Sequence, residues 1–242
     1  MRKKVISAIV LAILSFSLVA CANDVAKDND GKGDTNNEAV TDGRNEENIS
    51  DQNEDVVKEP YNPKYELAEG LEYKVNEDGT SCTITGIGTC ELNEFSIPEE
   101  IDGYSVTIIG ERGTYAFYNC SGLTSIEIPN SVTKIGRCAF YNCSGLTSIE
   151  IPDSVTSIDS EAFYGCSGLT SIEIPNSVTS LGSGVFWDCS SLTSIEIPDS
   201  VTSIGFDLFT GCSELTSIKV SSGSIAENFL KSQYGDKIEY ID

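Results

Sequence analysis

The sequence contains no histidine, one methionine and one tryptophan among its 242 residues. Without histidine there is no Ser-His-Asp or Cys-His nucleophile, no imidazole metal ligand and no side chain that ordinarily titrates near neutral pH. Basic residues are also scarce, since 15 Lys and Arg stand against 38 Asp and Glu, for a net charge of −23. This charge argues against nucleic acid and anionic lipid as partners, because both are bound through clustered positive charge.

The chain also lacks an apolar run of the roughly 20 residues that a membrane span needs. Its longest apolar stretch, residues 5–20, follows the basic start Arg2-Lys3-Lys4, as in a signal peptide. The stretch ends in Leu18-Val19-Ala20-Cys21, which resembles the lipobox of bacterial lipoproteins, where the cysteine is acylated and becomes the mature N-terminus. The resemblance implies a signal peptide over residues 1–20 and a lipid anchor at Cys21. An ordinary secretory signal peptide is the alternative.

Residues 21–66 are rich in Asp, Glu, Asn, Lys and Gly and have almost no large apolar side chains before Tyr61. Such a segment cannot bury enough apolar surface to offset the entropy of ordering it, so we expect a disordered acidic linker. A flexible chain of this length spans about 40 Å root-mean-square, which suits a tether between a membrane and a folded domain.

A 23-residue repeat occupies most of the remaining sequence. Cysteines recur at this interval, followed in nearly every copy by Leu-Thr-Ser-Ile-x-Ile-Pro, then Val-Thr-x-Ile-Gly, then a Phe three residues before the next cysteine. The five cysteines are Cys120, Cys143, Cys166, Cys189 and Cys212. A period of about 20–29 residues with this apolar pattern is the signature of leucine-rich repeats, which predicts a solenoid.

Each repeat is predicted to form one coil. Leu146, Ile149 and Ile151 should point into the core from a strand, while Ser148 and Glu150 point out. Val155 and Ile158 form a second inward pair, and Ala162 with Phe163 closes the back of the coil. Because no single coil can bury these groups, stacking at about 4.8 Å per strand makes one core with rows of like residues. The residue before each cysteine is Asn, Asp or Gly, all tolerant of a left-handed turn.

The two ends depart from the repeat and indicate caps. Residues 71–75 and 81–87, joined by a turn containing glycine, predict a hairpin, while residues 224–234 and 237–241 predict a short helix and a last edge strand. The predicted domains are a signal peptide (1–20), a lipidated cysteine with a disordered linker (21–66), an N-terminal cap with an irregular first repeat (67–119), 23-residue leucine-rich repeats (120–220) and a C-terminal cap (221–242).

The repeats closely resemble the BspA-like leucine-rich repeat family of bacterial surface proteins, whose coils read roughly C-S-x-L-T-S-I-x-I-P-x-S-V-T-x-I-G-x-x-A-F. The match covers about residues 71–242, and departures such as Asp159 for Gly and Val185 for Ala do not break the coil. The resemblance implies a leucine-rich repeat solenoid with a parallel β-sheet face and a mostly irregular back. Members are linked variously to adhesion, protein binding and host-surface contact, so no single ligand is implied.

We interpret the five repeat cysteines as a row of small buried groups. Neighbouring coils would bring them near disulfide distance, but their Cβ vectors run parallel and five in a row cannot all pair. Cys138 lies off the row, and Cys82 with Cys90 is the only plausible disulfide. We therefore expect mostly thiols.

The strand face carries an acidic row flanked by serines, and we take it as a candidate binding face. Its residues are Ser125, Glu127, Ser148, Glu150, Ser171, Glu173, Ser194, Glu196, Ser217 and Lys219. The carboxylates should lie about 5 Å apart in equivalent open environments, so nothing distinguishes an acid from a base as a glycosidase requires. A solvated acidic surface, a divalent-cation site and a docking surface for a cationic partner stay open.

A second row follows the core phenylalanines and forms a candidate aromatic strip. Its members are Tyr118, Tyr141, Tyr164 and Trp187. Rings at coil spacing can stack on each other as part of the back of the solenoid, or they can anchor a protein or glycan partner.

The sequence therefore predicts a lipid-anchored binding or adhesion module on the extracellular face of a bacterial envelope. Its partners would be proteins or glycans of host matrix, mucin or other cells, and it would meet the membrane through its N-terminal lipid. We expect no catalytic residues, no metal, no cofactor and no nucleic acid. Two alternatives stay open: a ligand-free structural spacer, and a carboxylate-dependent enzyme acting on glycans or peptides.

Overall fold

The computed structural model describes residues 63–88 and 91–241. The predicted signal peptide, Cys21, the linker up to residue 62, and Cys90 lie outside the described residues. The elements are β1 (Glu72–Val75), β2 (Ser81–Gly86), β3 (Glu94–Ser96), β4 (Glu100–Ile101), β5 (Tyr104–Ile109), β6 (Ser125–Glu127), β7 (Lys134–Ile135), β8 (Ser157–Ile158), β9 (Ser180–Leu181), β10 (Ser194–Glu196), β11 (Ser203–Ile204), β12 (Ser217–Ser221), α1 (Ile225–Tyr234), a 3-10 turn (Gly235–Lys237) and β13 (Ile238–Ile241).

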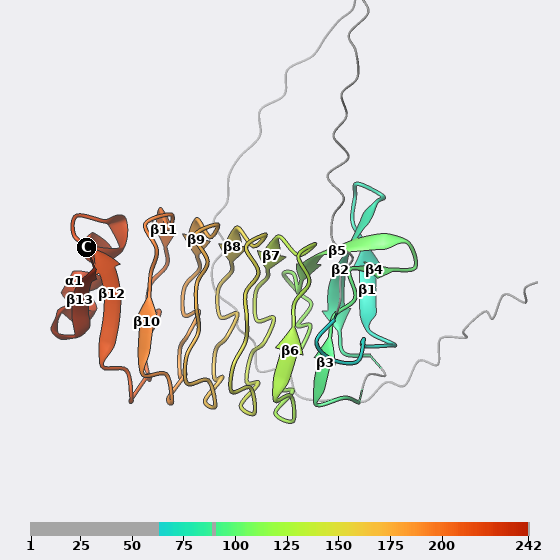
Figure 1. Ribbon diagram of the computed structural model, residues 1–242, viewed down its shortest axis with the longest axis horizontal. Coiled ribbons are helices and arrows are strands. Elements are labelled where there is room, and N and C mark those ends of the chain that lie inside the picture. Colours follow the sequence, from blue (N-terminus) through green and yellow to red (C-terminus); the bar gives the residue numbers. More distant parts are fainter. Residues whose placement is uncertain (1–62, 89–90, 242) are drawn as a thin grey trace, which may run out of the picture. The chain divides into compact units, whose positions relative to one another are not determined.

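These short elements stack as the coils of a leucine-rich repeat solenoid, which confirms the predicted fold class (Figure 1). The longest sheet has eight strands in the order β1-β2-β5-β7-β8-β9-β11, with β4 paired to β5. From β7 to β11 it is built from the Val-Thr-x-Ile segments, and pairing is parallel and in register, with Ile135 beside Ile158 and Ile158 beside Leu181. The Val-Thr-x-Ile segment was expected only to contribute an inward pair of side chains to the core. In the structure it forms the most continuous sheet.

The strand face is less continuous than expected. Strands form only near its ends, as the pair β3-β6 and the three-stranded sheet β10-β12-β13, with one isolated bridge from Glu127 to Glu150 between them. In the middle coils the amide nitrogen of Thr147 lies 3.4 Å from the Thr124 carbonyl oxygen. The equivalent bond in the longer sheet, from Thr156 N to Thr133 O, is 2.9 Å. The coils are therefore held more loosely along this face.

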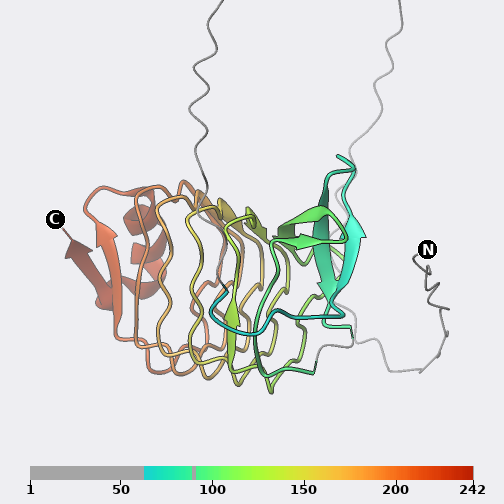
Figure 2. The ribbon, with the colours of Figure 1, turned by 45° about the vertical axis from the view of Figure 1, so that its right-hand side comes forward.

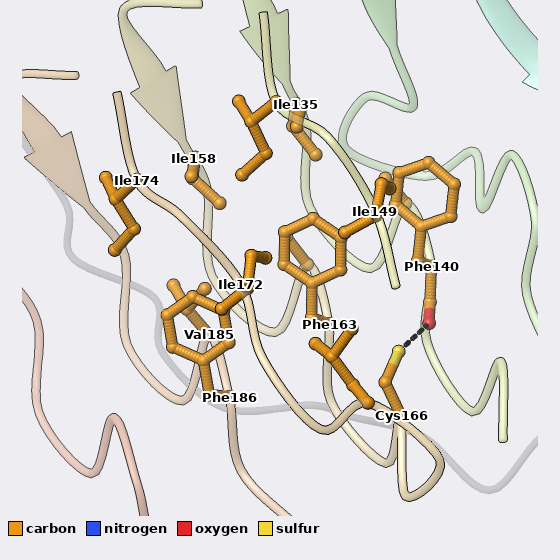
Figure 3. Close-up of a cluster of buried hydrophobic side chains, with 14 of the residues drawn as sticks. Ile135, Phe140, Ile149, Ile158, Phe163, Cys166, Ile172, Ile174, Val185 and Phe186 are labelled. Carbon is orange, nitrogen blue, oxygen red and sulfur yellow. Dashed lines mark hydrogen bonds between the residues drawn. The ribbon is translucent and has the colours of Figure 1, made fainter. Parts of the chain in front are cut away.

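The core consists of rows of like side chains, as the repeat predicts (Figure 3). The inward residues Leu146, Ile149, Ile151, Val155, Ile158, Ala162 and Phe163 are all buried. Phenylalanines form a continuous column through the coils, namely Phe95, Phe117, Phe140, Phe163, Phe186 and Phe209. In its centre the rings are almost parallel, with 5.3 Å between the centroids of Phe140 and Phe163. Tyr234 of α1 closes the column edge-on at 5.6 Å from Phe209.

Two residues of each coil adopt left-handed backbone angles. The first is the residue before the repeat cysteine, where Asn119, Asn142, Gly165, Asp188 and Gly211 have φ between 57° and 79°, as predicted. The second was not predicted and precedes the core Phe by two residues, at Cys138, Glu161, Gly184 and Asp207. At Asn142 and Cys138 φ is 58° and 53°. Each coil thus turns twice on its back, on either side of the buried phenylalanine.

Both predicted caps are present. β1 and β2 form an antiparallel hairpin that covers the first coil, and β13 pairs in parallel with β12 at the other end (Figure 1). Helix α1 begins at Ser224, whose hydroxyl accepts a hydrogen bond from Glu227 N at 3.0 Å. The Glu227 carboxylate in turn accepts hydrogen bonds from Gly223 N, at 2.7 Å, and the Tyr240 hydroxyl, at 2.8 Å. The Tyr240 bond joins the helix to β13.

Candidate binding face

The middle of the strand face is open, while its two ends are covered. Ser148, Glu150, Ser171, Glu173, Ser194, Glu196 and Lys219 are exposed, as predicted from their place in the repeat. Ser125 and Glu127 are only half-exposed, and Ser217 is buried. The proposed surface of ten residues is therefore reduced to an open face of seven, which spans the coils from Ser148 to Lys219.

Charge explains why strand pairing along the face is interrupted. Regular pairing occurs where a glutamate lies beside a different residue, since Glu127 is in register with Ser96, and Glu196 with Lys219. Where Glu127 lies beside Glu150 only a single bridge forms. Like charges directly opposite on adjacent strands are destabilising, so the row of identical glutamates loosens the coils that carry it.

The C-terminal end of the face is covered by the last strand. Ser217, expected on the surface, is 8% exposed because β13 packs beside its strand β12. Lys237 crosses this edge and donates a hydrogen bond from Nζ to the Leu215 carbonyl oxygen. Among the described residues the buried Ser217 hydroxyl has no hydrogen-bond partner. The prediction that Ser217 belongs to an accessible hydroxyl row is therefore wrong.

The N-terminal end is covered by residues 63–68, which we call the N-terminal strap. Its backbone pairs with β3, since Ser96 N donates to Glu66 O and Ala68 N to Ser96 O, both at 2.9 Å. The strap also passes over β6 (Figure 2). There Lys64 N donates to Glu127 Oε2 at 2.5 Å. The Ser125 hydroxyl donates to the Tyr65 hydroxyl at 2.8 Å.

Sequence reasoning placed residues 63–66 at the end of the linker and did not detect the strap. One signal was available, because Ser96 stands where the later coils have glutamate. Ser96 is completely buried, and its hydroxyl donates to Glu127 while accepting from Tyr65 N at 2.9 Å. A glutamate at this position would bury a charge under the strap.

The aromatic strip is a continuous column of half-exposed rings on the back of the coils. Centroids are 4.9 Å apart for Tyr118 and Tyr141, 4.4 Å for Tyr141 and Tyr164, and 5.9 Å for Tyr164 and Trp187. Tyr115 extends the column at 5.3 Å from Tyr118. Burial raises the pKa of the Tyr141 hydroxyl, and neighbouring Tyr164 adds to the effect. Neighbouring rings stack on both faces of Tyr141, and Trp187 lies tilted beside Tyr164, so the centre of the column presents ring edges rather than flat stacking platforms.

The repeat cysteines do more than fill space. The thiols of Cys143, Cys166, Cys189 and Cys212 each donate to the carbonyl oxygen of a core phenylalanine 26 residues earlier, at 3.0 to 3.1 Å. Figure 3 shows this bond between Cys166 and Phe140. Burial raises the pKa of these thiols, to about 11 at Cys212, so the thiolate is disfavoured.

The other three described cysteines are thiols as well. Cys120, predicted to be buried in the row, is only half-buried, with its sulfur 3.9 Å from the Tyr118 carbonyl oxygen. Cys82 is buried in the hairpin, 3.8 Å from the Tyr104 carbonyl oxygen, and its suggested partner Cys90 lies outside the described residues. Cys138, predicted off the row, lies on the back of its coil with its sulfur 3.3 Å from Glu161 Oε2. Burial and this carboxylate raise the pKa of Cys138 to about 12. Neither the Cys82 nor the Cys138 thiol is set up as a nucleophile.

Two further properties concern the described residues alone. Residues 63–88 and 91–241 contain no group of three or more Cys, Asp or Glu side chains placed to hold a metal ion. The glutamates of the strand face do not form such a group either. Over the same ranges, no helix has the length and apolar character needed to cross a membrane.

Comparisons with protein-family models and with solved structures both find leucine-rich repeat proteins. A sequence model described as BspA type leucine rich repeat region matches in six copies, over residues 87–142 and 107–234. A leucine rich repeat protein of T. pallidum is 34% identical over 62% of this chain and 69% of its own, with a TM-score of 0.59. A leucine-rich repeat protein from Bacteroides ovatus ATCC 8483 is 31% identical, with a TM-score of 0.53, over 63% of this chain and 46% of its own. No curated protein matches.

Proposed function

We propose that this chain, which belongs to the BspA-type leucine-rich repeat family, is a lipid-anchored binding module that holds a protein partner at the extracellular face of a bacterial envelope. The family assignment carries the fold and a general role in binding or structure. The partner and the anchor are inferred from this chain's own residues.

The observation that carries the proposal is the open face between the two covered ends. Glu150, Glu173 and Glu196 are exposed in successive coils with serines beside them, and Lys219 is the one basic residue of the row. An elongated row of this kind offers repeated equivalent contacts rather than a closed pocket, which suits a protein surface. The negative charge of the row favours a partner rich in Lys or Arg, because opposite charges would face each other across the interface and would speed the association of the two proteins.

The aromatic column supports a protein partner more than a glycan. Sugar rings bind proteins by stacking flat on an aromatic face, and both faces of Tyr141 are occupied, by Tyr118 at 4.9 Å and Tyr164 at 4.4 Å, while Trp187 lies tilted at 5.9 Å from Tyr164. The column is therefore primarily a packing element of the back of the solenoid. Substituting Tyr141 and Tyr164 with Ala should clearly lower the melting temperature. The same substitutions should change the strength of adhesion little.

The anchor is inferred from the lipobox-like Leu18-Val19-Ala20-Cys21 and from the acidic composition of the segment that follows. A lipid at Cys21, with the acidic segment as its tether, would hold the repeat domain clear of the membrane surface. Radiolabelled fatty acid fed to cells should be incorporated into the protein and not into Cys21→Ser. Incorporation into both would overturn the anchor at Cys21.

The binding proposal is tested with unlipidated chain that begins after residue 20 and carries Cys21→Ser. Immobilised chain is exposed to host matrix proteins, mucin and a glycan array, and saturable binding is measured at low and physiological salt. Saturable, salt-weakened binding to a basic protein supports the proposal. Its absence across all probes would favour a ligand-free spacer, and turnover of a glycan or peptide would favour an enzyme.

A further inference from the structure

We infer that the N-terminal strap is a displaceable cover whose outer residues, Lys64 and Tyr65, detach under tension on the tether and uncover Ser125 and Glu127 as an added coil of the open face. The inference rests on the proposed function, because it takes the strand face as the binding face and the chain before residue 63 as the tether.

The strap is held by two different sets of contacts. Its outer half is held by bonds to side chains: from Lys64 N to the Glu127 carboxylate at 2.5 Å, between the Ser125 and Tyr65 hydroxyls at 2.8 Å, and from Tyr65 N to the Ser96 hydroxyl at 2.9 Å. Its inner half is held through the backbone, by two bonds of 2.9 Å between Ser96 and residues 66 and 68.

The two halves also differ in burial. Lys64 is exposed and Tyr65 half-exposed, whereas Ala68 is 6% exposed within the core and its partner Ser96 is fully buried. The bond of exposed Lys64 is readily exchanged for a bond to water, and the two bonds of Tyr65 are only part-buried, so their net contribution to stability is small. The outer half of the strap is therefore the part that opens at least cost.

The direction of the chain makes tension act on the outer half first. A pull from the N-terminal side reaches Lys64, then Tyr65, and only afterwards the backbone pairing around Ser96. These bonds are loaded one after another rather than together, so the strap peels. Release of Lys64 and Tyr65 alone uncovers Ser125 and Glu127, whose carboxylate keeps the bond from the Ser96 hydroxyl, while the pairing of Glu66 and Ala68 with Ser96 keeps the rest in place.

The uncovered residues fit the row that they would join. Glu127 is bridged in register to Glu150, and Ser125 occupies the position of Ser148 in its own coil. Detachment would lengthen the acidic row by one coil on its N-terminal side. A partner that spans the row would then gain contacts when the anchor is under load, as for a cell held against flow.

The first test is amide hydrogen exchange by NMR on the unlipidated chain without any partner. Glu127→Gln removes the charge that holds Lys64 N, and Glu150→Gln is the matched control in the next, uncovered coil. We expect the Lys64 and Tyr65 amides to exchange about tenfold faster in E127Q, with the Ala68 and Ser96 amides unchanged and E150Q like the wild type. Equal acceleration of all four amides, or of none, would overturn the two-step release.

The second test pulls single molecules between handles at the two termini. The wild type should show a short first extension, of a few residues at about 3.4 Å each, before any coil unfolds. E127Q should lower the force of this first step and leave the force of coil unfolding unchanged, whereas E150Q should alter neither step. A first event that already includes a coil would overturn the inference. Both tests are free of partner, so a failed search for a binder leaves their result intact.

Discussion

Replacing one central glutamate of the open face should stabilise the protein, because Glu173 lies between two residues of the same charge, Glu150 and Glu196. The coils on either side are in register at this point, through the bonds from Thr170 N to Thr147 O and from Thr193 N to Thr170 O. Glu173→Gln removes both repulsions and keeps the size of the side chain.

The magnitude follows from the coil spacing. Two unit charges about 5 Å apart in water repel by about 0.8 kcal/mol, so two such pairs set an upper limit of about 1.6 kcal/mol. Exposed side chains spread apart, and we expect a gain of about 1 kcal/mol in the free energy of unfolding at low salt. Glu196→Gln is the control, because it removes one repulsion by Glu173 and one attraction to Lys219, with which it is in register. Its net effect should be near zero.

The assay is equilibrium urea unfolding at about 0.01 M and about 1 M ionic strength, where the Debye length is about 30 Å and about 3 Å. The advantage of E173Q should be largest at low salt and nearly vanish at high salt. An equal shift for E173Q and E196Q, or a gain that salt does not reduce, would refute charge repulsion as the reason for the interrupted pairing.

Three other substitutions test the core and the C-terminal cap by the same unfolding assay. Phe163→Ala should cost about 4 kcal/mol, since it opens the centre of the phenylalanine column. Phe206→Ala should cost about 1 kcal/mol or less, since this ring is 65% exposed and its tilted contact with Phe229 is at 5.5 Å. Cys166→Ala should cost about 1–2 kcal/mol. Cys166→Ser should cost less, because its hydroxyl can still donate to the Phe140 carbonyl oxygen. A larger loss for Cys166→Ser than for Cys166→Ala would mean that the cysteine contributes through packing alone. Glu227→Gln should destabilise at neutral pH, because hydrogen bonds from Gly223 N, Lys231 and Tyr240 lower the pKa of Glu227 to about 2. That difference should disappear as the pH falls from the ordinary glutamate range through 2, and a difference that persists there would contradict the assignment.

The parts of the fold that could be predicted are those repeated in the sequence. The 23-residue period places Ile149, Ile158 and Phe163 in the core, and each repeat supplies the same evidence again. The left-handed residue before each cysteine was predictable because Asn, Asp and Gly occur there without exception. The second left-handed position was hidden, since Cys138 and Glu161 are not residues that favour this conformation.

The binding face was less predictable because its ends depend on segments outside the repeat. The period alone makes Ser125, Ser171 and Ser217 equivalent, yet the strap half-covers the first and β13 buries the last. The strap has no second copy in the sequence and follows a polar segment, so pattern reasoning assigned residues 63–66 to the linker. Whether neighbouring coils form paired strands on this face depends on which charged side chains lie opposite each other. That can be known only from the register of the strands in three dimensions.

The thiol bonds also lay beyond sequence reasoning. A cysteine every 23 residues predicts a row, but the bond from Cys166 to Phe140 spans 26 residues and depends on how one coil stacks on the last. Each phenylalanine carbonyl already accepts a bond from the amide three residues later, as Phe140 O does from Cys143 N at 3.2 Å. The thiol is thus a second donor, which no pattern of residue types would disclose.

The central claim, that the open face binds a basic protein partner, is tested most directly by the affinity of the triple variant E150Q/E173Q/E196Q for the partner found by the binding screen. The matched control is D153N/D199N/E214Q, which removes the same charge from exposed positions off the row. Since the face variant should fold at least as stably as the wild type, a loss of binding cannot come from unfolding. We predict that affinity falls about tenfold or more for the face variant and much less for the control. Equal affinities for the two variants would contradict the claim.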